Sequence, residues 1–201
     1  MPQDTDLHKA AKDGDTQSCL DLLTCGADVN AVGAQGRTAL HRCLAGGFPE
    51  CCMVLLDNGA DATIRDSMQR SALIYACLGP ESDSALKCLE LLFQKNYEEM
   101  VGLINGATKS GTTALHCAIE KKAIEMVRFL HARGADIDLK DEDGKSCRDL
   151  AKEAKLPKDL FDPSKNAQRK GSTTPAATPE KKGGGLFGRM RRASKSNEVK
   201  L

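Results

Sequence analysis

The chain has 201 residues, of which 40% are hydrophobic and 3% aromatic, so it is long enough for one domain and a tail. Its formal net charge of +1 conceals an asymmetry between two parts of the sequence. Through Asp162 there are 19 Lys and Arg against 26 Asp and Glu, a net charge of −7, whereas from Pro163 onward there are 10 against 2, a net charge of +8. The sequence therefore predicts an acidic body and a separate basic tail.

No apolar run approaches the roughly 18 residues that a membrane span requires. The N-terminal residues also lack the apolar segment of a signal peptide. Nine cysteines without such a signal are typical of a reducing compartment. We therefore expect a cytoplasmic protein, with nuclear or peripheral membrane association as alternatives.

A sequence pattern returns along the body with a period of 33 residues. Leu7-His8 precedes Leu40-His41 by 33 residues, and Gly26-Ala27-Asp28 precedes Gly59-Ala60-Asp61 by the same distance. The pattern returns, displaced, at Thr113-Ala114-Leu115-His116. A fixed period of this size predicts a stack of similar units, because one short unit cannot bury its apolar face alone.

The pattern divides the chain into an array over residues 1–160 and a tail over 161–201. The tail is rich in Ser, Thr, Pro, Gly and Lys, and we expect it to be disordered because it cannot bury enough apolar surface to offset chain entropy. Within the array the expected units are about 4–35, 36–69, 70–110, 111–143 and a partial cap at 144–160. The N-cap of the first helix is expected among Asp4, Thr5 and Asp6.

The third unit departs from the period. It has three extra residues around Gly79 to Ser84 and six more within Asn96 to Leu103. Within Asn96 to Leu103, either the second helix of the unit is prolonged or a short extra helical turn forms. Insertions in repeat arrays gather on one face, often the binding face, although a tolerated surface loop explains the extra residues equally well. In the last unit Arg148 stands where the others have an inward Leu, which fits a terminal cap.

The repeated Gly-x-Thr-x-Leu-His of Gly36 to His41, with paired leucines and the Gly-Ala-Asp-Val-Asn of Gly26 to Asn30, resembles the ankyrin repeat. The resemblance covers about residues 6–155. It implies an all-α solenoid of stacked helix-turn-helix units, with β-hairpin-like fingers along one edge. Ala39, Ala72 and Ala114 replace the family's usual Pro after Thr, which removes a pre-set φ at the first helical position.

Three of the four histidines, His8, His41 and His116, share one position of the repeat. A structural role needs the same side chain in every layer, whereas a catalytic site does not. In the ankyrin family this imidazole bonds the backbone of a neighbouring loop, and the resemblance implies that role here. Ile74 replaces the histidine in the third unit, so we expect the loop there to be tied less firmly.

The cysteines are interpreted as small core hydrophobes. Cys19, Cys52 and Cys88 are equivalent positions of successive second helices. Neighbouring helices pack about 8–10 Å apart, which exceeds the Cα separation of about 4.4–6.8 Å that a disulfide spans. Because no Cys-x-x-Cys motif occurs, we do not expect a metal site either.

The sequence has no recognisable nucleophile–base pair or metal cluster. Ala107 to Gly111 lacks the Gly-x4-Gly-Lys-Ser/Thr spacing of a phosphate loop. We therefore expect a non-catalytic adaptor or regulator with no catalytic, cofactor or metal site and no small-molecule substrate. Its expected partner is another protein.

Ankyrin repeats usually hold their partners through the fingers and the faces of the first helices. The resemblance carries that role to the corresponding positions, among which Arg and Tyr are typical anchors of protein interfaces. The candidate partner-binding residues are Lys9, Gln35, Arg37, Arg42, Arg65, Met68, Arg70, Tyr75, Lys109 and Lys140. We expect the protein to be monomeric.

Asn30 is a candidate for hydroxylation. Leu22, Asp28, Val29 and Asn30 resemble the Leu-x5-Asp-aliphatic-Asn pattern on which asparaginyl hydroxylase acts, although the repeat consensus alone produces the same pattern.

The tail has candidate phosphorylation sites and a basic cluster. Ser194 follows Arg191-Arg192-Ala193 and resembles a site of basophilic kinases, and Thr174 and Thr178 each precede a Pro. Near an anionic leaflet each basic residue contributes about 1 kcal/mol to the attraction between the tail and the membrane. A phosphate at Ser194 would weaken that attraction. The alternatives are a phosphorylation-sensitive membrane tether, a nuclear-import signal, nonspecific nucleic-acid contact and a solvated tail.

Overall fold

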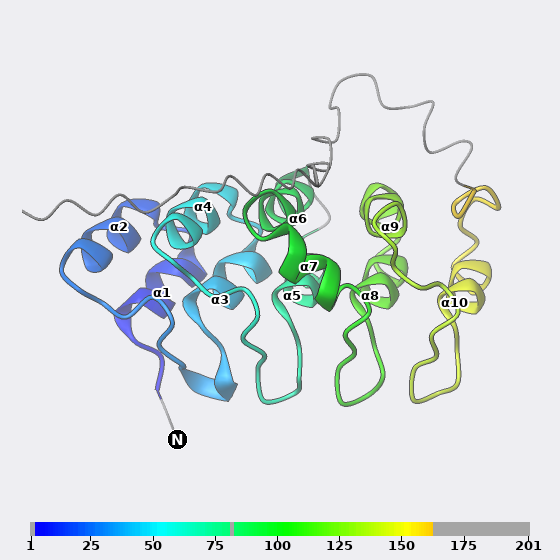
Figure 1. Cartoon of the computed structure of the whole chain (residues 1–201), viewed down its shortest axis with the longest axis horizontal. Helices are drawn as coiled ribbons and strands as arrows, with labels where there is room; N and C mark the ends of the chain where they lie inside the picture. The colour runs from blue at the N-terminus through cyan, green and yellow to red at the C-terminus, as the bar shows by residue number, and fades with distance from the viewer. Residues whose placement is uncertain (1–2, 81–82, 163–201) are drawn as a thin grey trace, which may run out of the picture. The chain divides into compact units, whose positions relative to one another are not determined.

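The computed structural model describes residues 3–80 and 83–162, and within these residues the chain is all-α. Most helices come in consecutive pairs, a first helix followed by a second helix (Figure 1). In chain order they are α1 (Asp6–Asp13), α2 (Thr16–Thr24), the 3-10 turn η1 (Ala34–Gly36), α3 (Ala39–Gly46), α4 (Pro49–Asp57), α5 (Ala72–Leu78), α6 (Asp83–Lys95), α7 (Tyr97–Leu103), α8 (Ala114–Glu120), α9 (Ile124–His131) and α10 (Cys147–Glu153).

The helices form two rows. The first helices α1, α3, α5, α8 and α10 make one row, and the second helices α2, α4, α6 and α9 make the other (Figure 1). Long loops project beyond the first-helix row (Figure 1). This arrangement confirms the stacked helix-turn-helix solenoid that the sequence predicts.

Four of the first helices begin with a reciprocal capping arrangement. In α3, Thr38 Oγ1 accepts the amide of His41 at 3.4 Å, and His41 Nδ1 accepts the amide of Thr38 at 3.0 Å. The arrangement satisfies donors that have no partner inside the helix. The corresponding pairs elsewhere are Thr5 with His8, Thr113 with His116, and Ser146 with Asp149. Among the three candidate caps of α1, Thr5 is therefore the N-cap.

Helix α5 begins differently. Its N-cap is Ser71, and the residue at the histidine position is Ile74, which has no acceptor. The Oγ of Ser71 is buried and has no hydrogen-bond partner within the described part of the chain. The loss of one histidine thus leaves one hydroxyl unsatisfied.

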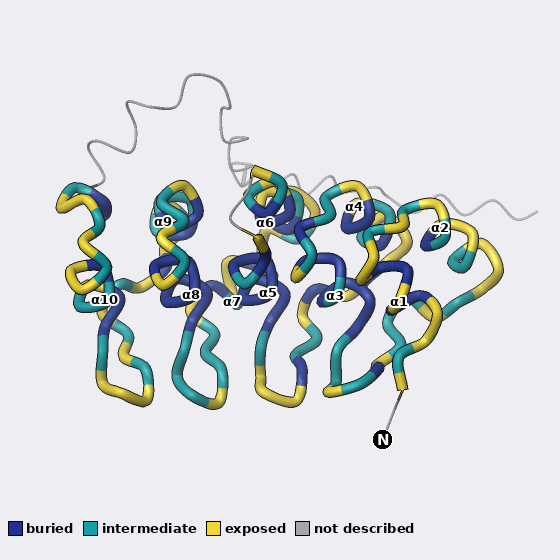
Figure 2. Tube along the Cα trace, turned by 180° about the vertical axis from the view of Figure 1, so that it is seen from behind, coloured by how far each residue is buried: buried dark blue, intermediate teal, exposed yellow. Residues whose placement is uncertain are grey.

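The core repeats one buried leucine in each full layer. Leu7, Leu40, Leu73 and Leu115 are each at most 2% exposed, and burying such a side chain contributes roughly 1.5–3 kcal/mol. Figure 2 shows the buried residues concentrated along the first-helix row. In α10 the same position is Arg148, which is exposed and pairs with Asp138 at 2.7 Å. A polar side chain therefore closes this end of the core.

The insertion in the third unit forms a separate short helix. Helix α6 ends at Lys95, and α7 follows it directly as an extra element. Met100 and Ile104 are buried and hold α7 against the array. Of the two arrangements that the sequence allows, the structure therefore has the extra helical turn.

Candidate partner-binding surface

The loops between helix pairs, here called the fingers, are residues 33–37, 66–70, 108–112 and 141–145. In each finger the amide of the first residue donates to the carbonyl of the fifth, at 2.8–3.1 Å. Each finger is also bonded to the next, through Ser67 N to Gln35 O, Lys109 N to Met68 O, and Glu142 N to Ser110 O, at 3.0–3.1 Å. The fingers are therefore one continuous hydrogen-bonded row.

Three fingers begin with a side chain that organises the turn. The Oδ1 of Asp66 accepts the amides of Met68 and Arg70, both at 2.8 Å. Asp141 Oδ1 and Thr108 Oγ1 accept the corresponding amides of their own fingers. Short polar side chains stabilise turns by such bonds to the backbone ahead of them.

The first finger begins with Gly33, which has no side chain to organise the turn, and Asp4 bonds this finger at the amide that the other fingers use to bond the preceding finger. Its Oδ1 accepts the amide of Ala34 at 2.8 Å, and its Oδ2 accepts from Arg42. A Cβ on residue 33 would lie 2.5 Å from this Oδ1 and 2.8 Å from His8 Nε2. Burial raises the pKa of Asp4, but the bonds from Arg42 and Ala34 outweigh it, so the pKa lies below its usual value.

The second finger contains a buried charged network. Asp66 Oδ2 accepts from Arg70 Nε and from the hydroxyl of Tyr75, both at 2.8 Å. The Tyr75 ring lies 4.8 Å from the ring of His41 and 5.1 Å from the guanidinium of Arg70, measured to its centroid. The Asp66 side chain has no exposed area, so its charge depends on these donors together with the amides of Met68 and Arg70.

The network shifts the pKa of each member. Burial raises the pKa of Asp66, but the hydrogen bonds from Arg70 and Tyr75 lower it further, so the carboxylate stays charged. Burial and the bond to Asp66 raise the pKa of Tyr75 to about 12. Burial lowers the pKa of His41 to about 4, against the raising effect of Asp66. The cluster therefore contains a neutral imidazole and one ion pair near neutral pH.

The candidate partner-binding residues differ widely in exposure. Lys9, Gln35, Met68, Lys109 and Lys140 are exposed. Arg37, Arg42, Arg65 and Arg70 are half-buried, and three of them bond within the molecule, to Asp4, Asp66 or backbone carbonyls.

Tyr75 was expected on the outer face of its helix, and that expectation is wrong. The side chain is 4% exposed because Asp66 and Arg70 draw its hydroxyl inward. It therefore supports the second finger from beneath and is not available to a partner. Asp4, which the sequence indicated only as a candidate helix cap, is the residue missing from the predicted surface.

The histidines tie successive loops, as predicted. His8 Nδ1 accepts the amide of Thr5, so its Nε2 carries the proton and donates to Arg37 O at 2.9 Å. His116 Nε2 lies 3.4 Å from Lys145 O in the same way. In the unit of Ile74, Arg65 Nη1 instead donates to Ala107 O at 3.3 Å, directly before the third finger.

Asn30 bridges two neighbouring turns. Its Nδ2 donates to Gly59 O at 3.1 Å, and its Oδ1 accepts the amide of Asp61 at 2.8 Å. Asn105 makes the equivalent pair of bonds to the turn that contains Asp136. The amide of Asn30 thus has a structural use; its hydroxylation stays a prediction.

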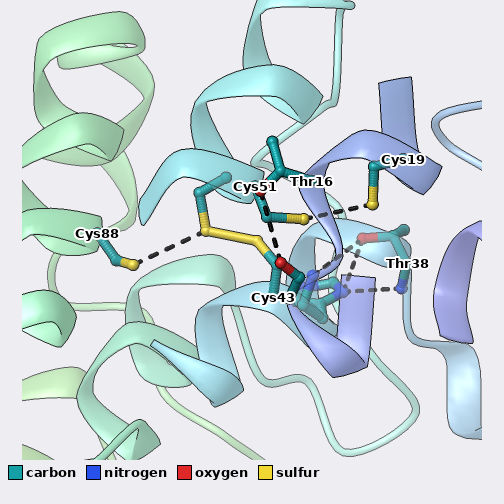
Figure 3. The surroundings of a disulfide bond; sticks show 9 residues. Thr16, Cys19, Thr38, Cys43, Cys51 and Cys88 are labelled. Carbon is teal, nitrogen blue, oxygen red and sulfur yellow. Dashed lines mark hydrogen bonds between the residues drawn. A yellow bond between two sulfur atoms is a disulfide. The ribbon is translucent and has the colours of Figure 1, made fainter. Parts of the chain in front are cut away.

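The cysteines require a correction. Cys43 and Cys52 form a disulfide, with Cα atoms 6.0 Å apart (Figure 3). The interpretation as core thiols is wrong for this pair, because they face each other from the two helices of one unit and not from successive units. Around them Cys19 and Cys51 have Sγ atoms 3.4 Å apart, and Cys88 lies 3.8 Å from Cys52 (Figure 3). Burial raises the pKa of Cys88 to about 12, so this thiol is unreactive.

Two general features concern the described residues alone. None of their helices is both long and apolar enough to cross a membrane. They also contain no group of three or more His, Cys, Asp or Glu side chains placed to hold a metal ion.

The stacked helix pairs and the bonded row of fingers define a repeat scaffold of the kind that presents a surface to other proteins. Two family models match the chain: ankyrin repeats (3 copies) over residues 7–101, and ankyrin repeats (many copies) over residues 98–151. The chain belongs to the ankyrin-repeat family. Ankyrin repeats generally mediate protein–protein interaction. No curated protein matches the chain.

The predicted modification sites Thr174, Thr178 and Ser194 lie outside the described residues, as does the basic cluster of the tail.

Proposed function

We propose that this chain is a non-catalytic adaptor or regulator that binds a partner protein across its fingers and first helices. The observation that carries the proposal is the bonded row of fingers, from which Gln35, Met68 and Lys109 project exposed at successive layers. A row held by backbone bonds is pre-organised, so a partner that binds it loses little entropy to loop ordering.

Met68 is the proposed apolar centre of this surface. It is 48% exposed at the second finger, with Arg65 directly before this finger and Lys109 in the next one. An exposed apolar side chain with cationic neighbours favours a partner segment that combines apolar and acidic residues.

Site-specific photo-crosslinking tests the proposal. A photo-reactive residue replaces Met68 in one variant of the full chain, and Met53 of α4, which is 43% exposed on a second helix, in the control. We expect a protein partner to be captured from native cells at position 68 and not at position 53. The captured protein must then bind the purified chain, and Met68→Asp must weaken that binding while Met53→Asp does not. Equal capture at both positions would contradict the proposed face.

The alternative function is targeting by the tail, supported by its net charge of +8 from Pro163 onward. In that case the tail determines where the repeat array is located, and membrane or nuclear localisation depends on residues 163–201. Deleting those residues separates the two functions: partner capture at position 68 survives in the first, whereas localisation is lost in the second. We also propose that the protein is cytoplasmic and monomeric, and that Asn30, Thr174, Thr178 and Ser194 are modified.

A further inference from the structure

The inserted helix α7 has an exposed apolar face. Tyr97 and Val101 are 53% and 37% exposed, and residues four apart lie on the same side of a helix. The Tyr97 ring meets the Phe93 ring edge-on, with centroids 6.3 Å apart, which supports the ring from within the array. Because Met100 and Ile104 anchor the other side of α7, the Tyr97–Val101 face is held in a fixed place.

One edge of this face is acidic. Glu98 is exposed and takes part in no ion pair among the described residues. It precedes Val101 by three residues, so its carboxylate adjoins the apolar pair. The array as a whole has a net charge of −7 through Asp162, which adds to the local negative potential.

The face is also open. Gly102, which follows Glu98 by four residues and so lies on the same side of the helix as Glu98, is exposed, and a Cβ there would have no atom within 4 Å. Helix α7 follows α6 directly and packs against it, before the chain enters the third finger (Figure 1). An insertion that departs from the repeat and exposes apolar surface is where a repeat array gains a binding function of its own.

We propose that the Tyr97–Val101 face of α7 docks a basic amphipathic helix of a partner protein. The apolar side chains of that helix cover Tyr97 and Val101, and a Lys or Arg of the helix pairs with Glu98. Charge complementarity selects the sign of the partner and speeds the encounter, while the apolar pair supplies the contact area that a helix seated on a helix buries. This surface is separate from the fingers and does not depend on the function proposed for them.

Fluorescence anisotropy tests the proposal with the full chain and a labelled model peptide, a short amphipathic helix of Leu and Lys. The same helix with Glu in place of Lys serves as the peptide control. We expect the Lys peptide to bind at low salt and the Glu peptide not to bind. Glu98→Lys, and separately Tyr97→Ala with Val101→Ser, should each weaken binding by about tenfold, as loss of central interface contacts does.

A second charge reversal controls for the net charge. Glu120→Lys changes the charge by the same amount at an exposed carboxylate of the fourth unit, and we expect its affinity to stay within about twofold of the wild type. Circular dichroism confirms that every variant folds. The proposal is overturned if the Lys peptide does not bind, if both charge reversals weaken it equally, or if the apolar pair can be replaced without loss.

Discussion

Asp4 accepts the backbone amide of Ala34 at 2.8 Å, although thirty residues separate them. The bond uses the amide of the second finger residue, which in the next three fingers donates to a carbonyl of the preceding finger. The N-terminal segment is therefore part of the candidate surface, because it fixes the finger from which Gln35 projects.

Replacing Asp4 by Ala should lower the free energy of unfolding by about 2 kcal/mol, because a buried amide and a half-buried guanidinium lose their acceptor. Asp4→Asn keeps an acceptor for Ala34 but removes the charge, so it should cost less. Asp6→Ala is the control, since Asp6 pairs only with Lys9 in solvent, and should cost no more than about 0.5 kcal/mol. Urea denaturation measures all three; an equal cost for Asp4→Ala and Asp6→Ala would contradict the role of Asp4.

The bond from Tyr75 to Asp66 should be among the most costly to remove. Tyr75→Phe deletes a donor to a buried carboxylate, which should cost about 2 kcal/mol, and Asp66→Asn should cost about 3 kcal/mol because it leaves Arg70 without its partner. The double variant should cost less than the sum, since both changes remove the same bond. Tyr97→Phe, at a half-exposed ring, should have little effect. Strict additivity in a double-mutant cycle would show that the two groups are not coupled.

How much of this was predictable depends on which residues repeat. The period of 33 residues predicts the stacked helix pairs, because one physical need recurs in every layer. The fingers and the loop-bonding histidines were expected from the resemblance to the ankyrin repeat. Tyr75 could not be placed, since its burial follows from a bond to an aspartate that is specific to one finger. The Cys43–Cys52 pair was not predicted, because equivalent positions of the repeat lie in successive units, whereas these two cysteines lie on the two helices of one unit.

His41 should make the array sensitive to acid. The pKa of His41 is about 4 in the folded state and about 6.5 in the unfolded state. Between these two pH values the unfolded chain binds a proton that the folded chain does not. Stability is therefore lost as the pH falls from about 6.5 to 4, by up to about 3 kcal/mol. His41→Gln keeps a capping acceptor without titrating, and its urea midpoint should fall less between about pH 7 and pH 5. An unchanged pH dependence in this variant would exclude His41 as the cause.

Ser71 and Thr113 are the same capping position in two units, but only Thr113 has a histidine to bond. Thr113→Ala should therefore cost about 1 kcal/mol. Ser71→Ala removes a buried hydroxyl that has no partner in the described part of the chain, so its effect should stay within about 0.5 kcal/mol or be stabilising. Thermal and urea unfolding of both variants give the comparison. A loss at Ser71 as large as that at Thr113 would mean that the Ser71 hydroxyl has an acceptor in solution.

Comparing substitutions at Gly111 and Gly144 separates the effect of the contact between fingers from the effect of backbone strain. Both have a left-handed φ, +75° and +74°, so an Ala at either position should cost about 1 kcal/mol in strain. A Cβ at Gly111 would also lie 3.0 Å from the Cα of Asp141 in the next finger, whereas a Cβ at Gly144 meets nothing within 4 Å. Gly111→Ala should therefore cost at least about 1 kcal/mol more than Gly144→Ala, because the neighbouring backbone must shift. Amide hydrogen exchange at Glu142, whose N–H bonds Ser110 across the two fingers, should accelerate only in Gly111→Ala; equal costs and unchanged exchange would mean that the row of fingers is looser than its hydrogen bonds indicate.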